Sequence, residues 1–307
     1  MKRYMTRRCW MTKVASTTAS FCALRHAGVV ADTTGPDAQF STGERDADGV
    51  VTFRVRSTLQ AEATEIRVLT PKDYQARRST KKRLPTVYFL PVEPGRENRF
   101  GDPMAEALRI DAANRFGVVC VAPTFAALPW YADHPTDRKL AQETYFRDVV
   151  VPFVEREFFV EASPSGRLLL GFSKSGWGAW CLLLRNPSIF GRAAAWDAPL
   201  EMTWPSKYGS QPIFGDEANF QRHRITKLLD ERAELFRPPR AGSVSAPNRP
   251  RLILLGHGNF QDDVAIHARL EMLGVPHVYR AGPKREHTWS SGWVEEVLQL
   301  LISKETN

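Results

Sequence analysis

The chain has 307 residues and a formal net charge of +8, a length that suffices for one large α/β domain with a sizeable core. Six basic residues precede Asp32, the first acidic residue, and removing their charges from +8 leaves +2 for the rest. A nearly neutral body argues against a nucleic-acid-binding face. No run approaches the roughly 20 apolar residues of a membrane span, so we expect no membrane partner either.

Residues 1–38 predict a disordered leader or a degenerate export signal. The segment starts with basic residues and continues with a weakly apolar stretch, 14–23, which Arg25 and His26 follow. A signal peptide has a firmer apolar centre than this. The compartment therefore stays open, with the cytoplasm favoured and export from a start at Met11 as the alternative.

The remaining segment, 39–307, predicts one domain in which strands alternate with helices. Expected strands are 50–57, 64–70, 84–90, 117–122, 167–170, 193–196, 251–255 and 277–280. Expected helices are 104–116, 140–158, 177–185, 262–273 and 293–302, and the basic segment 77–83 is expected as a turn. This order predicts an α/β fold with a mostly parallel central sheet and helices on both faces. In such sheets functional residues gather in the loops that follow the strands.

A Pro- and Arg-rich insertion, 201–250, follows the sixth expected strand. It carries the aromatic residues Trp204, Tyr208, Phe214 and Phe220. We expect it to cover the candidate site and to shape a substrate pocket. The alternative is a surface excursion whose aromatic side chains pack on the body.

A nucleophile elbow is predicted at Ser173. The serine follows an apolar strand pattern and precedes a helix pattern. In such a turn a strained backbone holds the hydroxyl above the sheet, next to the helix N-terminus. Small residues are needed two positions before and after the serine, and Gly171 and Ser175 supply them, although glycine is usual at the second position.

A nucleophilic serine needs a base within hydrogen-bond reach, and a third group must orient that base. Of the seven histidines, His287 is the candidate base, because it lies in a polar loop between the last expected strand and the last helix. His267 falls on an expected helix, where we expect it to pack or to face solvent.

The acid that orients the base has three candidates, ranked Asp197, then Asp263, then Asp262. The usual acid position follows the strand that ends at Leu255, and this chain has Asn259 there. An amide cannot stabilise an imidazolium as a carboxylate does. Asp197 follows the neighbouring strand, whereas Asp262 and Asp263 have helix N-capping as their alternative role.

An oxyanion formed during ester cleavage needs backbone N–H donors already in place. One expected donor is Lys174, the residue after the candidate nucleophile, at the positive end of a helix. The second should come from the loop 91–94. Because proline has no N–H, Val92 or Glu93 must supply it.

No metal-ligand spacing, phosphate-binding glycine loop or dinucleotide fingerprint is visible in the sequence, so we expect no cofactor and no metal. Cys120 falls in a strand pattern and Cys181 in a helix pattern. Both are interpreted as small buried residues rather than disulfide partners.

With these residues in view, the segment 50–302 resembles α/β-hydrolases of the putative esterase family, which includes esterase D, feruloyl esterase and enterochelin esterase-like proteins. The resemblance rests on the run 84–90 (LPTVYFL), the elbow at Ser173, the run 273–279 (LGVPHVY), and His287 with the tryptophans that follow it. It implies an α/β-hydrolase fold and a serine hydrolase for carboxylic esters, with Ser173 as nucleophile and His287 as base.

Three positions depart from the family pattern: Pro91 and Val92 replace a usual His-Gly pair, Ser175 replaces glycine, and Asn259 replaces the acid. We expect a small-molecule ester substrate, small or sugar-linked, cleaved by Ser-His-Asp chemistry through an acyl-enzyme. The alternative is a catalytically inactive hydrolase-like protein that binds a ligand or partner, and a peptidase is a weaker third choice. The oligomeric state stays open.

Overall fold

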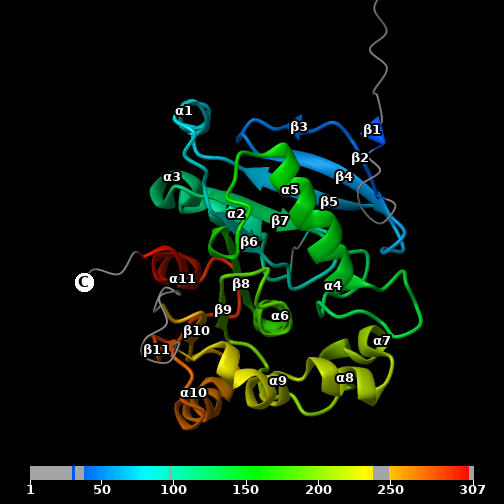
Figure 1. Ribbon diagram of the computed structural model, residues 1–307, viewed down its shortest axis with the longest axis vertical. Coiled ribbons are helices and arrows are strands. Elements are labelled where there is room, and N and C mark those ends of the chain that lie inside the picture. The colour runs from blue at the N-terminus through cyan, green and yellow to red at the C-terminus, as the bar shows by residue number, and fades with distance from the viewer. Residues whose placement is uncertain (1–29, 32–37, 97–98, 238–248, 304–307) are drawn as a thin grey trace, which may run out of the picture.

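A single sheet runs through the centre of the molecule, with helices on both of its faces (Figure 1). The computed structural model describes residues 30–31, 38–96, 99–237 and 249–303. Most of the expected leader, 1–38, lies outside the described residues. Within it, Val30–Ala31 forms a short strand that pairs with the next one.

The sheet has eleven strands in the described part of the chain. They are β1 Val30–Ala31, β2 Ala38–Phe40, β3 Glu44–Arg45, β4 Val51–Ser57, β5 Thr64–Leu69, β6 Thr86–Phe89, β7 Val119–Pro123, β8 Arg167–Phe172, β9 Arg192–Trp196, β10 Leu252–Leu255 and β11 His277–Arg280. Their order is β1-β2-β4-β5-β7-β6-β8-β9-β10-β11, with β3 paired to β4. Along this order across the sheet, the pairs between β7 and β11 are parallel, β6 included, and the pairs between β1 and β7 are antiparallel, as is β3 with β4.

The helices form two layers. They are α1 Tyr74–Ser79, α2 Pro103–Arg109, α3 Ala112–Phe116, α4 Gln142–Tyr145, α5 Val151–Glu157, α6 Ser173–Arg185, α7 Gln211–Phe214, α8 Glu217–His223, α9 Ile225–Arg232, α10 Asp262–Met272 and α11 Trp293–Ile302. In Figure 1, α3 and α11 lie on one side of the sheet and α5 and α6 on the other. These features confirm the predicted α/β fold with a mostly parallel sheet.

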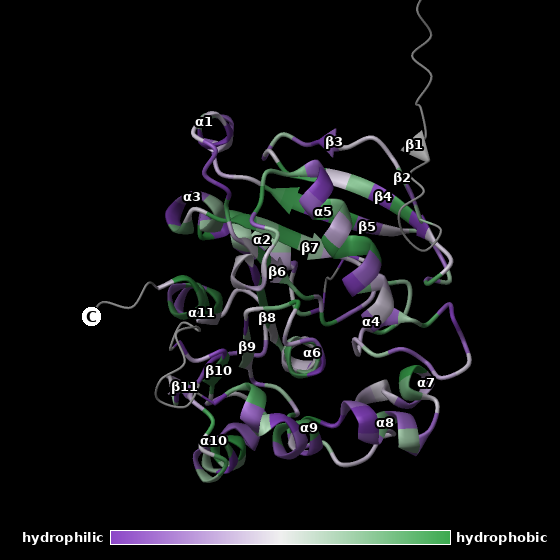
Figure 2. Ribbon diagram, in the orientation of Figure 1, coloured by the Kyte–Doolittle hydropathy of each residue, from purple (hydrophilic) through white to green (hydrophobic). Residues whose placement is uncertain are grey.

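Side-chain alternation along the central strands divides the core into two clusters. On β8, Leu168, Leu170 and Phe172 pack with α11, whereas Leu169 points to the side of α6. The alternation follows from the period of two in an extended strand. Because both faces are covered, every residue of β6 is buried, and so is every residue of β8 after Arg167. In Figure 2 the middle of the sheet is coloured mostly green to white.

Several expected boundaries were wrong. The predicted helix 104–116 is two helices, because Asp111 adopts a left-handed backbone conformation, with φ of +52°, between α2 and α3. The predicted helix 140–158 contains a π-helical segment, Phe146–Val150, between α4 and α5. The expected basic turn begins inside α1, and the short strands β1 to β3 were not predicted.

The insertion after β9 contains α7, α8 and α9, and residues 238–248 lie outside the described residues. Its four aromatic residues divide into two kinds. Phe214 and Phe220 are fully buried, and the ring of Phe214 lies 5.5 Å from that of Trp177 on α6. Trp204 and Tyr208 are each 50% exposed. The insertion is therefore anchored by one aromatic pair and leaves the other at the surface.

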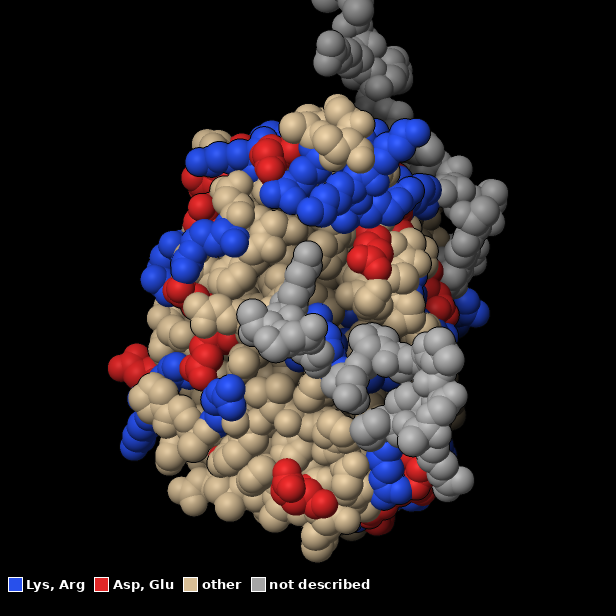
Figure 3. Space-filling model, turned by 60° about the vertical axis from the view of Figure 1, so that its left-hand side comes forward, with Lys and Arg blue, Asp and Glu red and all other residues tan. Residues whose placement is uncertain are grey.

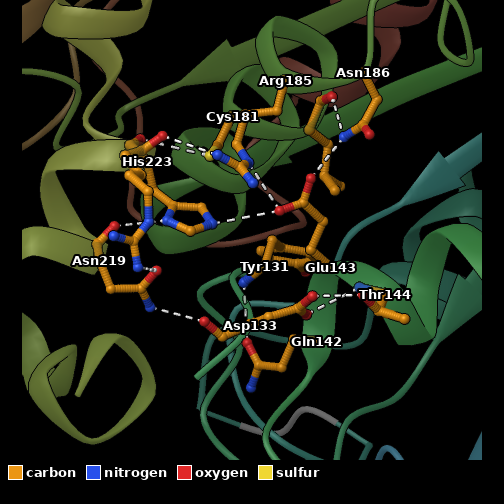
Figure 4. A network of polar contacts seen from close by, with 12 residues as sticks. Tyr131, Asp133, Gln142, Glu143, Thr144, Cys181, Arg185, Asn186, Asn219 and His223 are labelled. Atoms are coloured by element: carbon orange, nitrogen blue, oxygen red, sulfur yellow. Dashed lines mark hydrogen bonds and ion pairs between the residues drawn. The ribbon is translucent and has the colours of Figure 1, made fainter. Parts of the chain in front are cut away.

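A buried polar network joins the insertion to α4 and α6 (Figure 4). Glu143 on α4 accepts hydrogen bonds from Arg185 and Asn186, both at 2.8 Å, and lies 3.3 Å from Nε2 of His223 on α8. Burial would raise the pKa of Glu143, but His223 and Arg185 outweigh that effect and lower it to about 2. Asn219 of α8 donates to the carbonyl of Asp133 at 2.7 Å.

The surface charge is uneven. Figure 3 shows Lys and Arg side chains gathered on the upper part of one face, with a largely uncharged area below them. Exposed basic residues of α1 and the turn after it include Arg78, Lys81 and Lys82.

None of the helices in the described ranges is long and apolar enough to cross a membrane.

Candidate active site

Ser173 stands at the junction of β8 and α6, with no intervening loop. Its φ is +51°, a left-handed conformation that costs a non-glycine residue roughly 1 kcal/mol or more. The side chain is mostly buried, and its backbone N–H donates to the carbonyl of Asp197 at 3.0 Å. A positive φ at a direct strand-to-helix junction is the backbone geometry that the predicted nucleophile elbow requires.

Ser175 replaces the usual glycine of the elbow without crowding it. Its hydroxyl accepts from the N–H of Phe172 at 3.1 Å and donates to the carbonyl of Phe172 at 2.9 Å. Gly171 makes room for this arrangement, because a Cβ there would lie 2.5 Å from the Ser175 carbonyl oxygen. The departure from glycine therefore adds two hydrogen bonds inside the turn.

His287 and Asp197 meet although they are 90 residues apart in the sequence. The distance from Nδ1 of His287 to Oδ2 of Asp197 is 2.5 Å, and the carboxylate is fully buried. The second carboxylate oxygen accepts the N–H of Phe260 at 2.6 Å. Because a carboxylate only accepts hydrogen bonds, Nδ1 carries a proton and a neutral ring keeps its lone pair on Nε2.

Asp197 also joins the histidine loop to the elbow. Its carbonyl accepts the Ser173 N–H, and its side chain holds His287, while the ring of Phe172 lies 4.9 Å from the imidazole. Asp197 itself has a positive φ of +44° directly after β9. A Cβ on Gly258 would lie only 1.9 Å from Asp197 Cγ, so the carboxylate occupies space that this glycine leaves open.

The other two candidate acids have different partners. Asp263 accepts a hydrogen bond from the Tyr279 hydroxyl at 2.9 Å. Asp262 accepts the N–H of Glu201 at 2.7 Å, and burial raises its pKa. Asn259, at the usual acid position, is exposed. Of the three ranked carboxylates, Asp197 is the one that is hydrogen-bonded to His287.

The two segments expected to provide oxyanion donors are held together by an ion pair. The ammonium of Lys174 lies 3.1 Å from a carboxylate oxygen of Glu93, and both side chains are largely buried. Beside them, the Tyr131 hydroxyl donates to the carbonyl of Pro91 at 2.6 Å, and Val92 is fully buried. The glutamate charge is thus neutralised by a lysine on the first turn of α6.

Aromatic rings surround the imidazole of His287. The centroids of Phe100, Phe172 and Phe260 lie 5.3, 4.9 and 5.9 Å from its own. Tyr208 of the insertion lies 5.4 Å from Phe260, which extends this apolar surface to the exposed part of the insertion. Sequence reasoning missed Phe100 and Phe260, because both lie in irregular loops and only the fold brings them together.

A possible metal-ligand group lies outside this site. His267 and Glu271 on α10 and His277 on β11 place their ligand atoms within 4.8 Å of one another. No metal site was expected from the sequence, and His267 was expected to pack or to face solvent. The available signal was the spacing of four residues between His267 and Glu271, which puts both on one helix face. His277 joins them only because the chain reverses at Gly274.

A family model described as "Putative esterase" matches residues 57–234 of the chain. A search of curated proteins finds no match. A solved ferulic acid esterase superposes with a TM-score of 0.62 at 18% identity, covering 82% of this chain and 95% of that one. An S-formylglutathione hydrolase from Agrobacterium tumefaciens gives 0.64 at 15% identity, with coverages of 86% and 98%. A fluorophosphonate-binding serine hydrolase of Staphylococcus aureus gives 0.63 at 15% identity, with coverages of 85% and 99%.

Proposed function

Because this chain belongs to the Putative esterase family, we propose that it is a serine hydrolase that cleaves a carboxylic ester through an acyl-enzyme. The observation that carries the proposal is the 2.5 Å hydrogen bond from His287 to the buried carboxylate of Asp197, beside an elbow that bears Ser173. A histidine that only faces solvent requires no buried carboxylate. A histidine that gains and loses a proton during turnover requires one, because the carboxylate orients the ring and stabilises the imidazolium.

In the proposed reaction, Ser173 Oγ attacks the ester carbonyl while Nε2 of His287 accepts the hydroxyl proton. Asp197 keeps the ring oriented and stabilises the imidazolium. His287 then returns the proton to the departing alcohol, which leaves Ser173 acylated. A water molecule, deprotonated by the same imidazole, hydrolyses the acyl-enzyme and restores the serine.

We assign the stabilisation of the negative charge that develops on the carbonyl oxygen to two backbone N–H groups. One belongs to Lys174 and the other to Val92 or Glu93. The Lys174–Glu93 ion pair supports this assignment, because it ties the loop after β6 to the first turn of α6. Both proposed donors would then be fixed before substrate arrives. Preorganised donors are worth more than donors that must be ordered during the reaction.

The substrate class follows from the rings around His287. Phe100 and Phe260, extended by Tyr208, favour an ester with an apolar or aromatic face. The name of the ferulic acid esterase above refers to an aromatic carboxylic acid, which is consistent with this preference. We therefore include an aromatic acyl ester, methyl ferulate, beside short-chain esters in the test.

The test measures hydrolysis of p-nitrophenyl acetate, p-nitrophenyl butyrate and methyl ferulate by the wild type, Ser173→Ala and the control Ser206→Ala. Ser206 is exposed in the insertion, so its loss should leave turnover unchanged. A fluorophosphonate probe should label the wild type and the control but not Ser173→Ala. A folded wild type that neither turns over any of these esters nor takes up the probe would overturn the proposal in favour of a ligand-binding protein.

A further inference from the structure

We propose that His267, Glu271 and His277 form a zinc-binding site that is separate from the candidate active site. Two imidazoles and one carboxylate are a ligand set that Zn²⁺ accepts in proteins, with a water molecule as fourth ligand. Hard ions such as Mg²⁺ and Ca²⁺ prefer oxygen ligands alone. Two nitrogen ligands and one oxygen ligand therefore favour an ion of intermediate hardness such as Zn²⁺ over Mg²⁺ or Ca²⁺.

The two imidazoles are aimed at each other. Nδ1 of His267 lies 2.7 Å from Nε2 of His277, and Oε1 of Glu271 lies 3.8 Å from the same Nε2. Zn–N bonds of about 2.05 Å in a tetrahedral site separate two nitrogens by about 3.3 Å. A shift of a few tenths of an ångström in each ring is enough to admit the ion.

The orientation of each ring is fixed by a further contact. Nδ1 of His277 lies 2.9 Å from the carbonyl of Val275, so this nitrogen holds the proton and Nε2 presents its lone pair to the ion. The ring of His267 stacks on Tyr279 at 4.3 Å with an angle of 18° between planes. A backbone carbonyl behind a metal-binding histidine is the usual second contact of such ligands.

The site has one closed and one open side. The side chain of His277 is 3% exposed, whereas that of Glu271 is 68% exposed. An ion can therefore enter from solvent, displace to solvent the proton between the imidazoles, and bind the exposed carboxylate of Glu271. Because the three ligands come from α10 and from the start of β11, the ion would join the last strand of the sheet to the helix beside it.

Position in the sheet separates this role from catalysis. His277 is the first residue of β11, whereas the residues proposed for catalysis lie after the carboxyl ends of β8, β9 and β11. We assign the ion a structural role: it holds β11, an edge strand whose carboxyl end leads into the loop that carries His287.

The test is equilibrium dialysis of the full chain against Zn²⁺ after treatment with EDTA, in a Cys9→Ser, Cys22→Ser background that removes competing thiols. Cys120 and Cys181 are buried and stay in place. We expect one zinc ion per chain in this background. His267→Ala and Glu271→Gln should weaken binding, the histidine variant by at least about 100-fold, the upper end of the loss caused by removing an outer-shell partner.

His134→Asn is the matched control, since His134 lies on the loop before α4 and its Nδ1 accepts hydrogen bonds from the backbone of Thr136 and Asp137. This variant should bind zinc as the background does. A second readout is the thermal midpoint, which zinc should raise in the background and in His134→Asn but not in His267→Ala or Glu271→Gln. Glu271 is exposed, so its variant folds whatever the fate of the histidine variant. Equal zinc affinity in all variants, or no zinc bound at micromolar concentration, would overturn the proposal and leave the two imidazoles as a packed hydrogen-bonded pair.

Discussion

The space that Gly258 leaves beside Asp197 gives the candidate site its sharpest test, the substitution Gly258→Ala. A methyl group at this position would lie 1.9 Å from Cγ of Asp197 and 2.1 Å from its Oδ1. Carbon atoms in contact lie about 3.5 Å apart or more, so the carboxylate or the loop must move by about 1.5 Å. Oδ1 holds the N–H of Phe260 and Oδ2 holds His287, so the carboxylate cannot move that far and keep both bonds.

The expected cost follows from the role proposed for Asp197. Misplacement of a catalytic group by about 1 Å can cost about 100-fold, and loss of the orienting carboxylate costs about 10⁴-fold in a serine protease. We therefore expect Gly258→Ala to lower kcat for p-nitrophenyl butyrate by about 10²- to 10⁴-fold. The change in KM should be small, because the methyl group disturbs the hydrogen bond between His287 and Asp197 rather than the apolar surface that would bind substrate.

The assay compares Gly258→Ala with Asn259→Ala, a variant of the neighbouring, exposed residue at the usual acid position. The control should keep wild-type turnover, and thermal unfolding should show that both variants fold. Combining Gly258→Ala with Asp197→Asn should cost no more than Asp197→Asn alone, because both act on the same group. Turnover of Gly258→Ala within threefold of the wild type would refute the assignment of Asp197 as the acid.

Three further predictions follow. Asp197→Asn should lower kcat by about 10⁴-fold in the same ester assay while the circular dichroism spectrum is unchanged. Lys174→Met should lower kcat/KM by about 10- to 100-fold, because it leaves Glu93 buried without its cation and loosens the loop after β6. Adding Glu93→Leu to this variant should restore part of the lost activity. Equal rates in the wild type, the single variant and the double variant would show that the ion pair has no role in catalysis. Glu143 has an ordinary pKa of 4.5 and a folded pKa of about 2, so its stabilising contribution is complete above about pH 4.5 and is lost as the pH falls toward 2. Urea unfolding at several pH values between 2 and 4.5 measures how the free energy of unfolding falls with pH, and Glu143 contributes at most about 1.4 kcal/mol per pH unit to that slope. Glu143→Gln should make the slope shallower. A slope equal to that of the wild type would contradict this account.

The strand-to-helix turn at Ser173 was predictable because its signals are local. An apolar run that ends in small residues around Ser173 marks the turn whatever the rest of the chain does, and β8 and α6 follow it as expected. The order of strands and helices likewise predicts a parallel sheet from sequence alone. The break at Asp111 left no comparable signal, because the residue that adopts the positive φ there is not a glycine.

Contacts between loops could not be predicted from the amino-acid sequence. Phe100 and Phe260 have no periodic pattern around them, and their positions beside His287 depend on how three loops pack. The zinc ligands illustrate the same limit. Two of them share a helix face, but the third arrives through the turn at Gly274, and no spacing rule for metal sites contains that combination.

The register of β9 and β10 explains how a carboxylate outside the usual acid position can be in reach of the histidine. Trp196 pairs with Leu255, so the residues that follow them, Asp197 and Gly256, emerge side by side from the carboxyl edge of the sheet. A carboxylate after β9 then reaches His287 only if the turn after β10 leaves it space, and Gly258 leaves that space. The exposed amide of Asn259 and the missing side chain of Gly258 therefore belong together. The turn after β10 carries no carboxylate at its usual position, leaves space for the carboxylate of Asp197, and donates the N–H of Phe260 to it.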